Sequence, residues 1–561
     1  YQTAPLTALV AFTTNDGLRT RVTVEGKTEG QDITDTLDLT RTHLVPVLGL
    51  YADYENTVHL ELLNSRDEVV KENTLTIETD VLPEYLRTAV NVEKAGEPTS
   101  MDLMLVSGLS TPYVYAFDSA GEIRWYCSLE REYYGAFPLE NGHILIESPD
   151  VLYPNSSMPN SPEMLEMDYL GRVFQIYYFP EGVHHEVKEK TPDGNLLVAT
   201  NSNDGYEQNM VQEIDRNTGE VVKSLNLNEL LSELPYITRD DWCHINTVSY
   251  DEATDSVLIS SRNLHSVIRV NWTTDEIQWI LGNPELWEGT VYEDKVLVPT
   301  EDFQWHYQQH SSYQLEEDLD GNPETAEIML FDNHNAQYQM LDSYDSTGHS
   351  YVKIYAVNAR EGTVSQLANY PTEYSSITSN TFGMWEENRI FSVNAYLPAS
   401  DGYQGKIYEL DAETGEEINT WTISHRFYRA YNVSFDLWDA SMPFELSETY
   451  RKGTLRTPIQ VEQPVRIEGT SMLTEEQAEF ILQENILYLY GGDHTYTQII
   501  FNGEDHTYAY DISDIKLRSE NVDSYQYRLP IPIQDLEPDT YEIQVMYYDR
   551  LYNTNASFTI E

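Results

Sequence analysis

Short runs of alternating apolar and polar residues fill most of the chain, and turn residues separate them. The clearest pair consists of two β-rich runs, residues 247–250 and residues 256–260, joined by an Asp-rich turn. If the two runs form a hairpin, His244, Asn246 and Arg262 meet at one edge of it. No window has the pattern of a long helix, and the chain is rich in tyrosine, so the pattern predicts an all-β protein.

A strand–turn–strand pattern recurs six times between about residue 100 and residue 436. Each copy carries Asp or Asn at its turn, and the successive spacings are 50, 47, 56, 87 and 53 residues for Asp118, Asp168, Asp215, Asn271, Asn358 and Asp411. Four strands fill such a period, so we expect a six-bladed β-propeller over residues 95–436. The first repeat lacks an innermost strand, which residues 428–435 are expected to supply, and the acidic loop 316–327 is expected to explain the long spacing.

The flanking regions also have β patterns. Residues 1–88 predict an N-terminal β-sandwich domain, followed by an acidic linker from Glu78 to Pro98. Residues 437–561 predict a C-terminal β-rich domain with a short helix over residues 474–484, with Thr474 as its N-cap.

The charge balance narrows the possible partners. The net charge is −61, from 94 acidic and 33 basic residues, which argues against nucleic acid and anionic membranes. We expect a secreted or cell-envelope protein, periplasmic or surface-anchored, whose signal segment is not present in this chain. No apolar run is long enough to span a bilayer. Cys127 and Cys243 are far apart and not in a metal-type spacing, so we expect free buried thiols.

In a propeller the innermost strands all begin around one end of the central channel, and the second strands end there. Aligning the repeats brings the following residues to that end: His184, His185, His244, His310, Thr378, Tyr428, Arg429, Arg262 and Asn333. Only one of the neighbours His184 and His185 is expected to face the channel. His306 is assigned to a loop and His143 to a structural role. No carboxylate lies among the aligned positions, which argues against a glycosidase pair.

This set suits an oxyanion. Imidazole is a nucleophile near neutral pH, and arginine binds tetrahedral oxyanions through its fork of donors. Two alternatives remain open from the residues alone. One is a metal-dependent propeller lyase or hydrolase, because three histidines can bind a metal ion. The other is a non-catalytic extracellular binding propeller.

Several motifs together resemble bacterial aryl-sulfate sulfotransferases. They are residues 241–246, 257–262, 309–310, 331–333 and 376–379, with the opening segments 4–9 and 46–51. The likeness covers residues 1 to about 436. Residues 437–561 match nothing in the family, no cysteine closely precedes His310, and Ser350-Tyr351 stands where the family has a serine–arginine pair.

The resemblance implies transfer of a sulfuryl group from a phenolic sulfate ester to a phenol without a nucleotide donor, and we expect ping-pong kinetics. We expect no cofactor and no metal ion. The resemblance also implies that His310 is transiently sulfated and that His244, Asn246, Arg262 and Thr378 surround the sulfate. A further catalytic histidine corresponds to His184 or His185, and we expect Asn333, Tyr428 and Arg429 to contribute to substrate binding. The natural donor and acceptor are not specified, and a homodimer is left open.

Overall fold

The structure is a computed structural model. It describes residues 3–28, 30–109, 111–129, 135–147, 153–154, 159–202, 206–235, 237, 240–300, 303–337, 341–435, 450–453, 455, 457–462, 478–483, 485–491, 496–512, 527–547 and 550–561. These residues are mostly β-strand, so the all-β prediction is confirmed. The helical elements among them are short: η1 (Glu84–Leu86), α1 (Leu227–Leu230), η2 (Glu252–Thr254), η3 (Pro284–Leu286) and η4 (Glu293–Lys295). None of the described helices has the length and apolar character needed to cross a membrane.

The N-terminal region forms one continuous sheet in the order β2-β1-β3-β4. Its strands are β1 (Ala8–Val24), β2 (Ile33–Val47), β3 (Glu55–Leu63) and β4 (Val69–Glu78). β1 runs on through register shifts between Thr13 and Thr20 and stays paired with β2 on both sides of them. The sandwich arrangement stays a prediction. Val22 and Leu60 share a core with Met104 and Phe391 of the central region, so this sheet packs directly against it.

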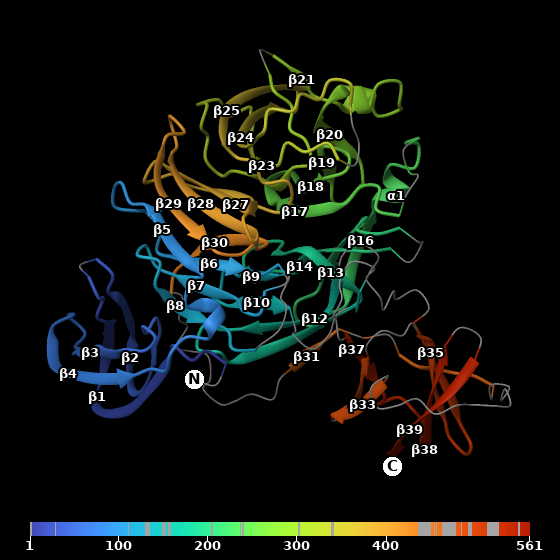
Figure 1. Cartoon of the computed structure of the whole chain (residues 1–561), viewed down its shortest axis with the longest axis horizontal. Helices are drawn as coiled ribbons and strands as arrows, with labels where there is room; N and C mark the ends of the chain where they lie inside the picture. The colour runs from blue at the N-terminus through green and yellow to red at the C-terminus, as the bar shows by residue number, and fades with distance from the viewer. Residues whose placement is uncertain are drawn as a thin grey trace.

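The central region contains sheets arranged around a common centre, where β30, β6, β9, β14 and β17 lie (Figure 1). Its strands are β5 (Val90–Lys94), β6 (Leu103–Ser107), β7 (Tyr115–Phe117), β8 (Ile123–Tyr126), β9 (Ala136–Pro138), β10 (Ile144–Glu147), β11 (Tyr153–Pro154), β12 (Pro159–Met167), β13 (Val173–Glu189), β14 (Leu196–Thr200), β15 (Met210–Ile214), β16 (Val221–Asn226), β17 (Ile245–Asp251), β18 (Ser256–Ser261), β19 (Ser266–Asn271), β20 (Ile277–Gly282), β21 (Val298–Pro299), β22 (His310–Gln314), β23 (Ala326–Asp332), β24 (His349–Asn358), β25 (Thr363–Glu373), β26 (Asn380–Met384), β27 (Arg389–Ala399), β28 (Gly402–Asp411), β29 (Glu417–Ile423) and β30 (Arg429–Val433).

Most of these strands pair in sequence order, as in propeller blades. The orders are β17-β18-β19-β20, β22-β23-β24-β25, β26-β27-β28-β29 and β30-β6-β7-β8. The first part of β13 pairs with β12 and its last part with β14, which joins β9 to β16 into one larger sheet. The count of six blades stays a prediction, because β13 belongs to both halves of that sheet.

The recurring Asp or Asn has a local physical cause. Its side chain accepts hydrogen bonds from backbone N–H groups of the following turn, as Asp118 does from Ala120 and Glu122, and Asp411 from Glu413 and Thr414. Such Asx turns close the hairpin between two adjacent strands. The repeat seen in the sequence is therefore a repeat of turn chemistry.

The expected closing strand is confirmed. β30 pairs antiparallel with β6, with Arg429 opposite Ser107 and Val433 opposite Leu103. The segment expected to be a linker contains β5, which pairs with β29 and extends that sheet. The linker prediction is therefore wrong for residues 90–94, whose alternating valines suit a sheet edge.

The long fourth spacing is not explained by the acidic loop alone. The connection from β20 to β22 holds η3, η4 and β21, and β21 pairs in parallel with β25. The acidic segment forms the shorter connection from β22 to β23.

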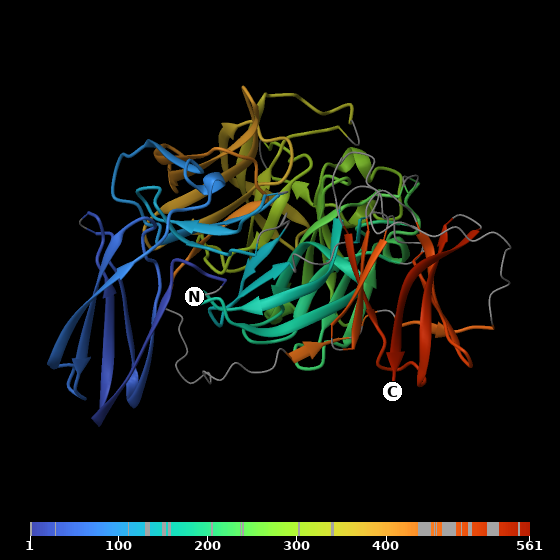
Figure 2. The ribbon, with the colours of Figure 1, turned by 60° about the horizontal axis from the view of Figure 1, so that its bottom comes forward.

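The C-terminal region contains two sheets, β32-β36-β35-β38-β39 and β33-β34-β37, and lies beside the central region (Figure 2). Its strands are β31 (Tyr450–Lys452), β32 (Ile459–Gln460), β33 (Ala478–Gln483), β34 (Ile486–Gly491), β35 (Tyr496–Asn502), β36 (Thr507–Asp511), β37 (Tyr527–Pro532), β38 (Asp539–Tyr547) and β39 (Arg550–Ile560). β31 joins β13 in parallel. The predicted helix is wrong for residues 478–483, because pairing with β34 makes β33 a strand. Its predicted N-cap Thr474, residues 475–477 and residue 484 lie outside the described residues. The domain limits stay predictions.

Candidate active site

His310 is the first residue of β22 and is only 2% exposed. Its Nδ1 lies 2.6 Å from Asn333 Oδ1. The amide nitrogen of Asn333 donates to the carbonyl oxygens of Ser375 and Thr378, at 2.8 and 3.1 Å, so the amide oxygen must face His310 as an acceptor. Nδ1 of His310 therefore carries the proton, and Nε2 has a free lone pair.

His244 is oriented in the same way by a carboxylate. Its Nδ1 lies 2.8 Å from Oδ2 of Asp241, and both side chains are largely buried. Burial lowers the pKa of His244, Asp241 raises it, and Arg262 lowers it further, with a net decrease. A neutral His244 thus donates Nδ1–H to Asp241 and keeps Nε2 unprotonated.

The neighbours His184 and His185 have different surroundings. His184 Nε2 lies 3.0 Å from the carbonyl oxygen of Thr200, which can only accept, and burial lowers the pKa of His184 to about 3. The neutral ring therefore accepts at Nδ1, 2.9 Å from Nδ1 of His185. His185 is the donor in this contact, so it too keeps Nε2 unprotonated.

His185 is the member of the pair that lies against the other candidate residues. Its ring centroid is 4.7 Å from that of His244 and 5.8 Å from that of Tyr428. Burial and the nearby His244, His184, His310 and Arg429 hold its pKa well below the usual range. His184 instead connects His185 to β14.

Arg262 is buried immediately after β18, and its backbone N–H donates to the carbonyl oxygen of His244. Burial and then the positive charge of Arg262 hold the pKa of His310 well below its usual range, against the opposing effect of Asn333. The guanidinium contacts Asn263 at 3.4 Å and Gln308 at 3.5 Å. A cation therefore lies beside neutral histidines, as an anionic group requires.

Two residues predicted to bind substrate, Arg429 and Asn246, form hydrogen bonds to protein groups. Arg429 donates to Glu186 at 2.7 Å and to the carbonyl oxygen of Asn246 at 2.6 Å. The side-chain amide of Asn246 donates to the carbonyl oxygen of Gln309 at 2.7 Å. Asn246 thus holds the backbone next to His310, and Arg429 holds the backbone of Asn246. The amide nitrogen of Asn333 holds the carbonyl groups of Ser375 and Thr378.

Several of these residues have left-handed backbone conformations. The φ angles are +56° for His185, +54° for His244 and +60° for Thr378. Such conformations are costly for residues other than glycine, most of all for a β-branched residue, and concentrate at functional sites. The strand entrances around the centre are therefore shaped by strained backbone that the surrounding hydrogen bonds maintain.

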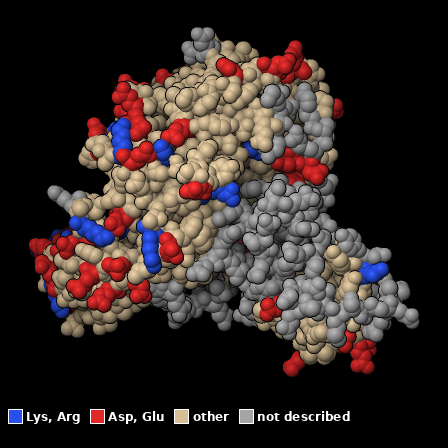
Figure 3. All heavy atoms as spheres, viewed as in Figure 1, with Lys and Arg blue, Asp and Glu red and all other residues tan. Residues whose placement is uncertain are grey.

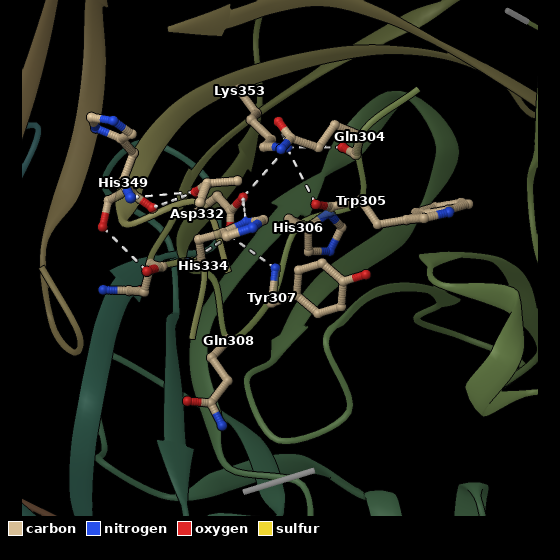
Figure 4. A network of polar contacts seen from close by, with 12 residues as sticks. Gln304, Trp305, His306, Tyr307, Gln308, Asp332, His334, His349 and Lys353 are labelled. Atoms are coloured by element: carbon tan, nitrogen blue, oxygen red, sulfur yellow. Dashed lines mark hydrogen bonds and ion pairs between the residues drawn. The ribbon is translucent and has the colours of Figure 1, made fainter. Parts of the chain in front are cut away.

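A buried ion pair supports the segment that leads to His310 (Figure 4). Lys353 Nζ lies 3.4 Å from Oδ2 of Asp332, and both side chains are fully buried. Lys353 also donates to the carbonyl oxygens of Gln304 and Trp305. Oδ1 of Asp332 accepts from the backbone N–H groups of Tyr307 and His334, each at 2.8 Å. The pair thus fixes residues on both sides of the His310–Asn333 contact.

The sequence missed two carboxylates of this site. Asp241 and Glu186 lie among the candidate residues, so the expectation that no carboxylate is present there is wrong. The alignment of the repeats did not include them, because Glu186 is one residue from the aligned position His185 and Asp241 is three residues from His244. Asp241 is the first residue of the motif 241–246 around His244, and this was the signal available for it.

Other expectations agree with the structure. His306 lies in a loop, although it is fully buried against Tyr355. His143 stacks on Phe174 and lies 2.7 Å from Glu166, and neither of these residues belongs to the candidate site. Cys127 and Cys243 are both buried, and neither forms a disulfide.

A cluster of possible metal ligands lies outside the candidate site. Among the described residues, one group of three His, Cys, Asp or Glu has ligand atoms all within 4.8 Å of one another, and it is Asp318, Asp320 and Glu327. The three histidines with free Nε2 atoms do not meet that criterion.

Known proteins match most of the chain. The arylsulfotransferase (ASST) family profile matches residues 89–432, and the arylsulfotransferase Ig-like domain profile matches residues 1–80. The arylsulfate sulfotransferase AssT of Escherichia coli O6:H1 is 22% identical, over 74% of this chain and 88% of the relative. The enzyme of the same name from Lelliottia amnigena is 20% identical, over 74% of this chain and 87% of the relative.

Two solved structures illustrate the distant matches. A putative 6-phosphogluconolactonase from Bacteroides uniformis shares 9% identity over 75% of this chain and 100% of that chain, with a TM-score of 0.32. Apo AztD from Citrobacter koseri shares 10% identity over 74% of this chain and 98% of that chain, with a TM-score of 0.29. These scores are too low to support a statement about function. The family profiles, by contrast, extend over most of residues 1–432, and the chain belongs to the arylsulfotransferase (ASST) family as an aryl-sulfate sulfotransferase.

Proposed function

We propose that this enzyme transfers the sulfuryl group in two displacements, through a covalent intermediate on Nε2 of His310. The observation that carries the proposal is the fixed tautomer of His310. Asn333 cannot reverse its amide without losing the two carbonyl acceptors of its nitrogen, so Nδ1 stays protonated and Nε2 stays nucleophilic.

In the first displacement, Nε2 of His310 attacks the sulfur of an aryl sulfate. The N–S bond forms, the bond from sulfur to the phenolic oxygen breaks, and the phenolate leaves with the electron pair. The sulfated ring carries a positive charge, which the hydrogen bond from Nδ1–H to Asn333 stabilises. Arg262 offsets the negative charge of the sulfuryl oxygens.

In the second displacement, an acceptor phenol takes the place of the first. His244 takes the phenol proton at Nε2, and Asp241 stabilises the imidazolium that forms. The phenolic oxygen bonds to sulfur, the N–S bond breaks, and His310 returns to its neutral form. His244 releases its proton to solvent or to a leaving phenolate, and His185 lies close enough to His244 to share this proton transfer.

Steady-state kinetics with p-nitrophenyl sulfate as donor and phenol as acceptor test the proposal. Varying both substrates should give parallel double-reciprocal lines, and donor alone should give a burst of one p-nitrophenol per chain. His310→Asn, which keeps a polar side chain of smaller size, should lose the burst. Intersecting lines without a burst would show direct transfer between the two substrates.

A further inference from the structure

The loop between β22 and β23 brings three carboxylates together. One oxygen each from Asp318, Asp320 and Glu327 lies within 4.8 Å of the other two. The two aspartates are exposed, whereas Glu327 is only 4% exposed at the start of β23. The backbone N–H of Asn322 donates hydrogen bonds to both aspartates. The cluster combines one buried acid with two accessible ones.

Glu327 is the member of the cluster that indicates a bound cation. Its Oε1 is buried and has no hydrogen-bond partner among the described residues. The strand fixes its position, because its carbonyl oxygen accepts from Leu315 N–H at 2.8 Å. The carboxylate faces two further acids, and the ion pair at this loop, between Arg360 and Glu324, uses a different carboxylate. A buried carboxylate beside like charges is costly unless a cation compensates it.

A divalent cation among the three carboxylates would remove the repulsion between their negative charges and supply the partner that Oε1 of Glu327 lacks.

The donor set identifies the type of cation. All three side chains offer oxygen, which hard cations prefer, and neither sulfur nor imidazole is part of the group. Ca²⁺ accepts irregular oxygen ligands from flexible loops and fills its remaining positions with water, whereas Mg²⁺ demands near-ideal octahedral geometry. We propose that Asp318, Asp320 and Glu327 form a calcium site in the β22–β23 loop.

The place of this site in the fold makes its role structural. The loop joins the end of β22 to the start of β23, whereas His310 begins β22 and Asn333 follows the end of β23. The cation would therefore stabilise the turn of the hairpin that carries the proposed nucleophile at its opposite end. Transfer activity should not depend on the cation, whereas the thermal stability should.

Calcium titration of the full chain, after dialysis against EDTA, tests the proposal by calorimetry and thermal unfolding. We expect saturable binding of one Ca²⁺ and a rise in Tm of about 2–4 °C or more at saturation. Glu327→Gln, which keeps the side-chain volume, should abolish both effects. In EDTA it should melt at or above the wild-type temperature, because it removes the uncompensated charge. Glu324→Gln, in the same loop but outside the cluster, is the control and should bind as the wild type does.

Asp320→Asn provides a second variant at an exposed position, where folding is not at risk, and it should weaken Ca²⁺ binding at least tenfold. Binding that survives both cluster substitutions would overturn the proposal, as would no binding up to about 10 mM, beyond the range of extracellular calcium modules. Equal affinity for Mg²⁺ would overturn the assignment to calcium. Loss of transfer activity in EDTA, restored by one metal, would contradict the structural role.

Discussion

Three histidines of the candidate site share one arrangement: each gives its Nδ1 proton to a fixed acceptor. The acceptors are Asn333 for His310, Asp241 for His244 and His184 for His185. All three rings therefore keep Nε2 unprotonated, but their partners differ in charge. The amide of Asn333 leaves His310 a neutral nucleophile, whereas the carboxylate of Asp241 favours protonation of His244. The different acceptors thus separate the proposed nucleophile from the proposed base.

Arg262 is the residue for which shape and charge can be tested separately. Arg262→Lys keeps the charge but loses the planar fork of donors. We expect kcat/KM for p-nitrophenyl sulfate to fall about 10²-fold or more, as when an oxyanion donor is removed. The free energy of unfolding should remain close to that of the wild type. Activity within a few-fold of the wild type would remove Arg262 from the sulfate-binding group.

At the scale of elements, buried asparagines connect innermost strands that belong to different sheets. The side chain of Asn380, on β26, donates to the carbonyl oxygen of Ala430 at 2.8 Å and accepts from its N–H at 3.0 Å. Ala430 lies on β30, the strand that closes the ring. One amide thus satisfies both polar groups of a residue on the inner edge of that strand.

Asn380→Ala should weaken the closure without touching a proposed catalytic group. It leaves a buried N–H and a buried C=O without their partner, at a cost of about 1–3 kcal/mol each. We expect a lower urea midpoint for the central region in denaturation experiments. Asn217→Ala, at an exposed turn, is the matched control. Equal midpoints for the two variants would show that closure does not depend on this contact.

Sequence patterns predicted the strands best where local chemistry determines them. The turn residues Asp and Asn revealed the repeat, because they form Asx turns. The closing strand β30 was predicted because the first repeat lacked an innermost strand. The patterns failed where a partner strand determines the secondary structure. β33 has a helical sequence pattern but pairs with β34 as a strand. β5 pairs with β29, which lies at the other end of the central region in sequence. The same reason hid Glu186, because its role depends on Arg429, 243 residues away.

At the scale of the whole molecule, an acidic surface encloses a core with neutral histidines. Figure 3 shows Asp and Glu gathered over the N-terminal sheet and along the upper edge of the face in view. His306 is fully buried, and burial lowers its pKa to about 3, although Asp332 opposes this shift. The unfolded chain therefore binds a proton at His306 at a higher pH than the folded chain does.

This difference predicts acid sensitivity. Because the folded pKa of His306 lies below the unfolded value of about 6.5, its contribution to stability is complete above that pH and is lost as the pH falls towards 3. The free energy of unfolding should decrease by up to about 1.4 kcal/mol per pH unit for this group. His306→Gln should show a shallower slope between pH 4 and pH 6 in urea denaturation. The exposed substitution His59→Gln should keep the wild-type slope, and an unchanged slope in His306→Gln would contradict the assignment.

The most direct test of the proposed mechanism is to trap and locate the sulfuryl group. The enzyme is incubated with p-nitrophenyl sulfate and no acceptor, digested under non-acidic conditions, and examined by mass spectrometry. The account predicts one added SO₃ per chain on the peptide that contains His310, its loss on addition of phenol, and no adduct in His310→Asn. An adduct on His244, His185 or His306, or unimpaired turnover in His310→Asn, would contradict it.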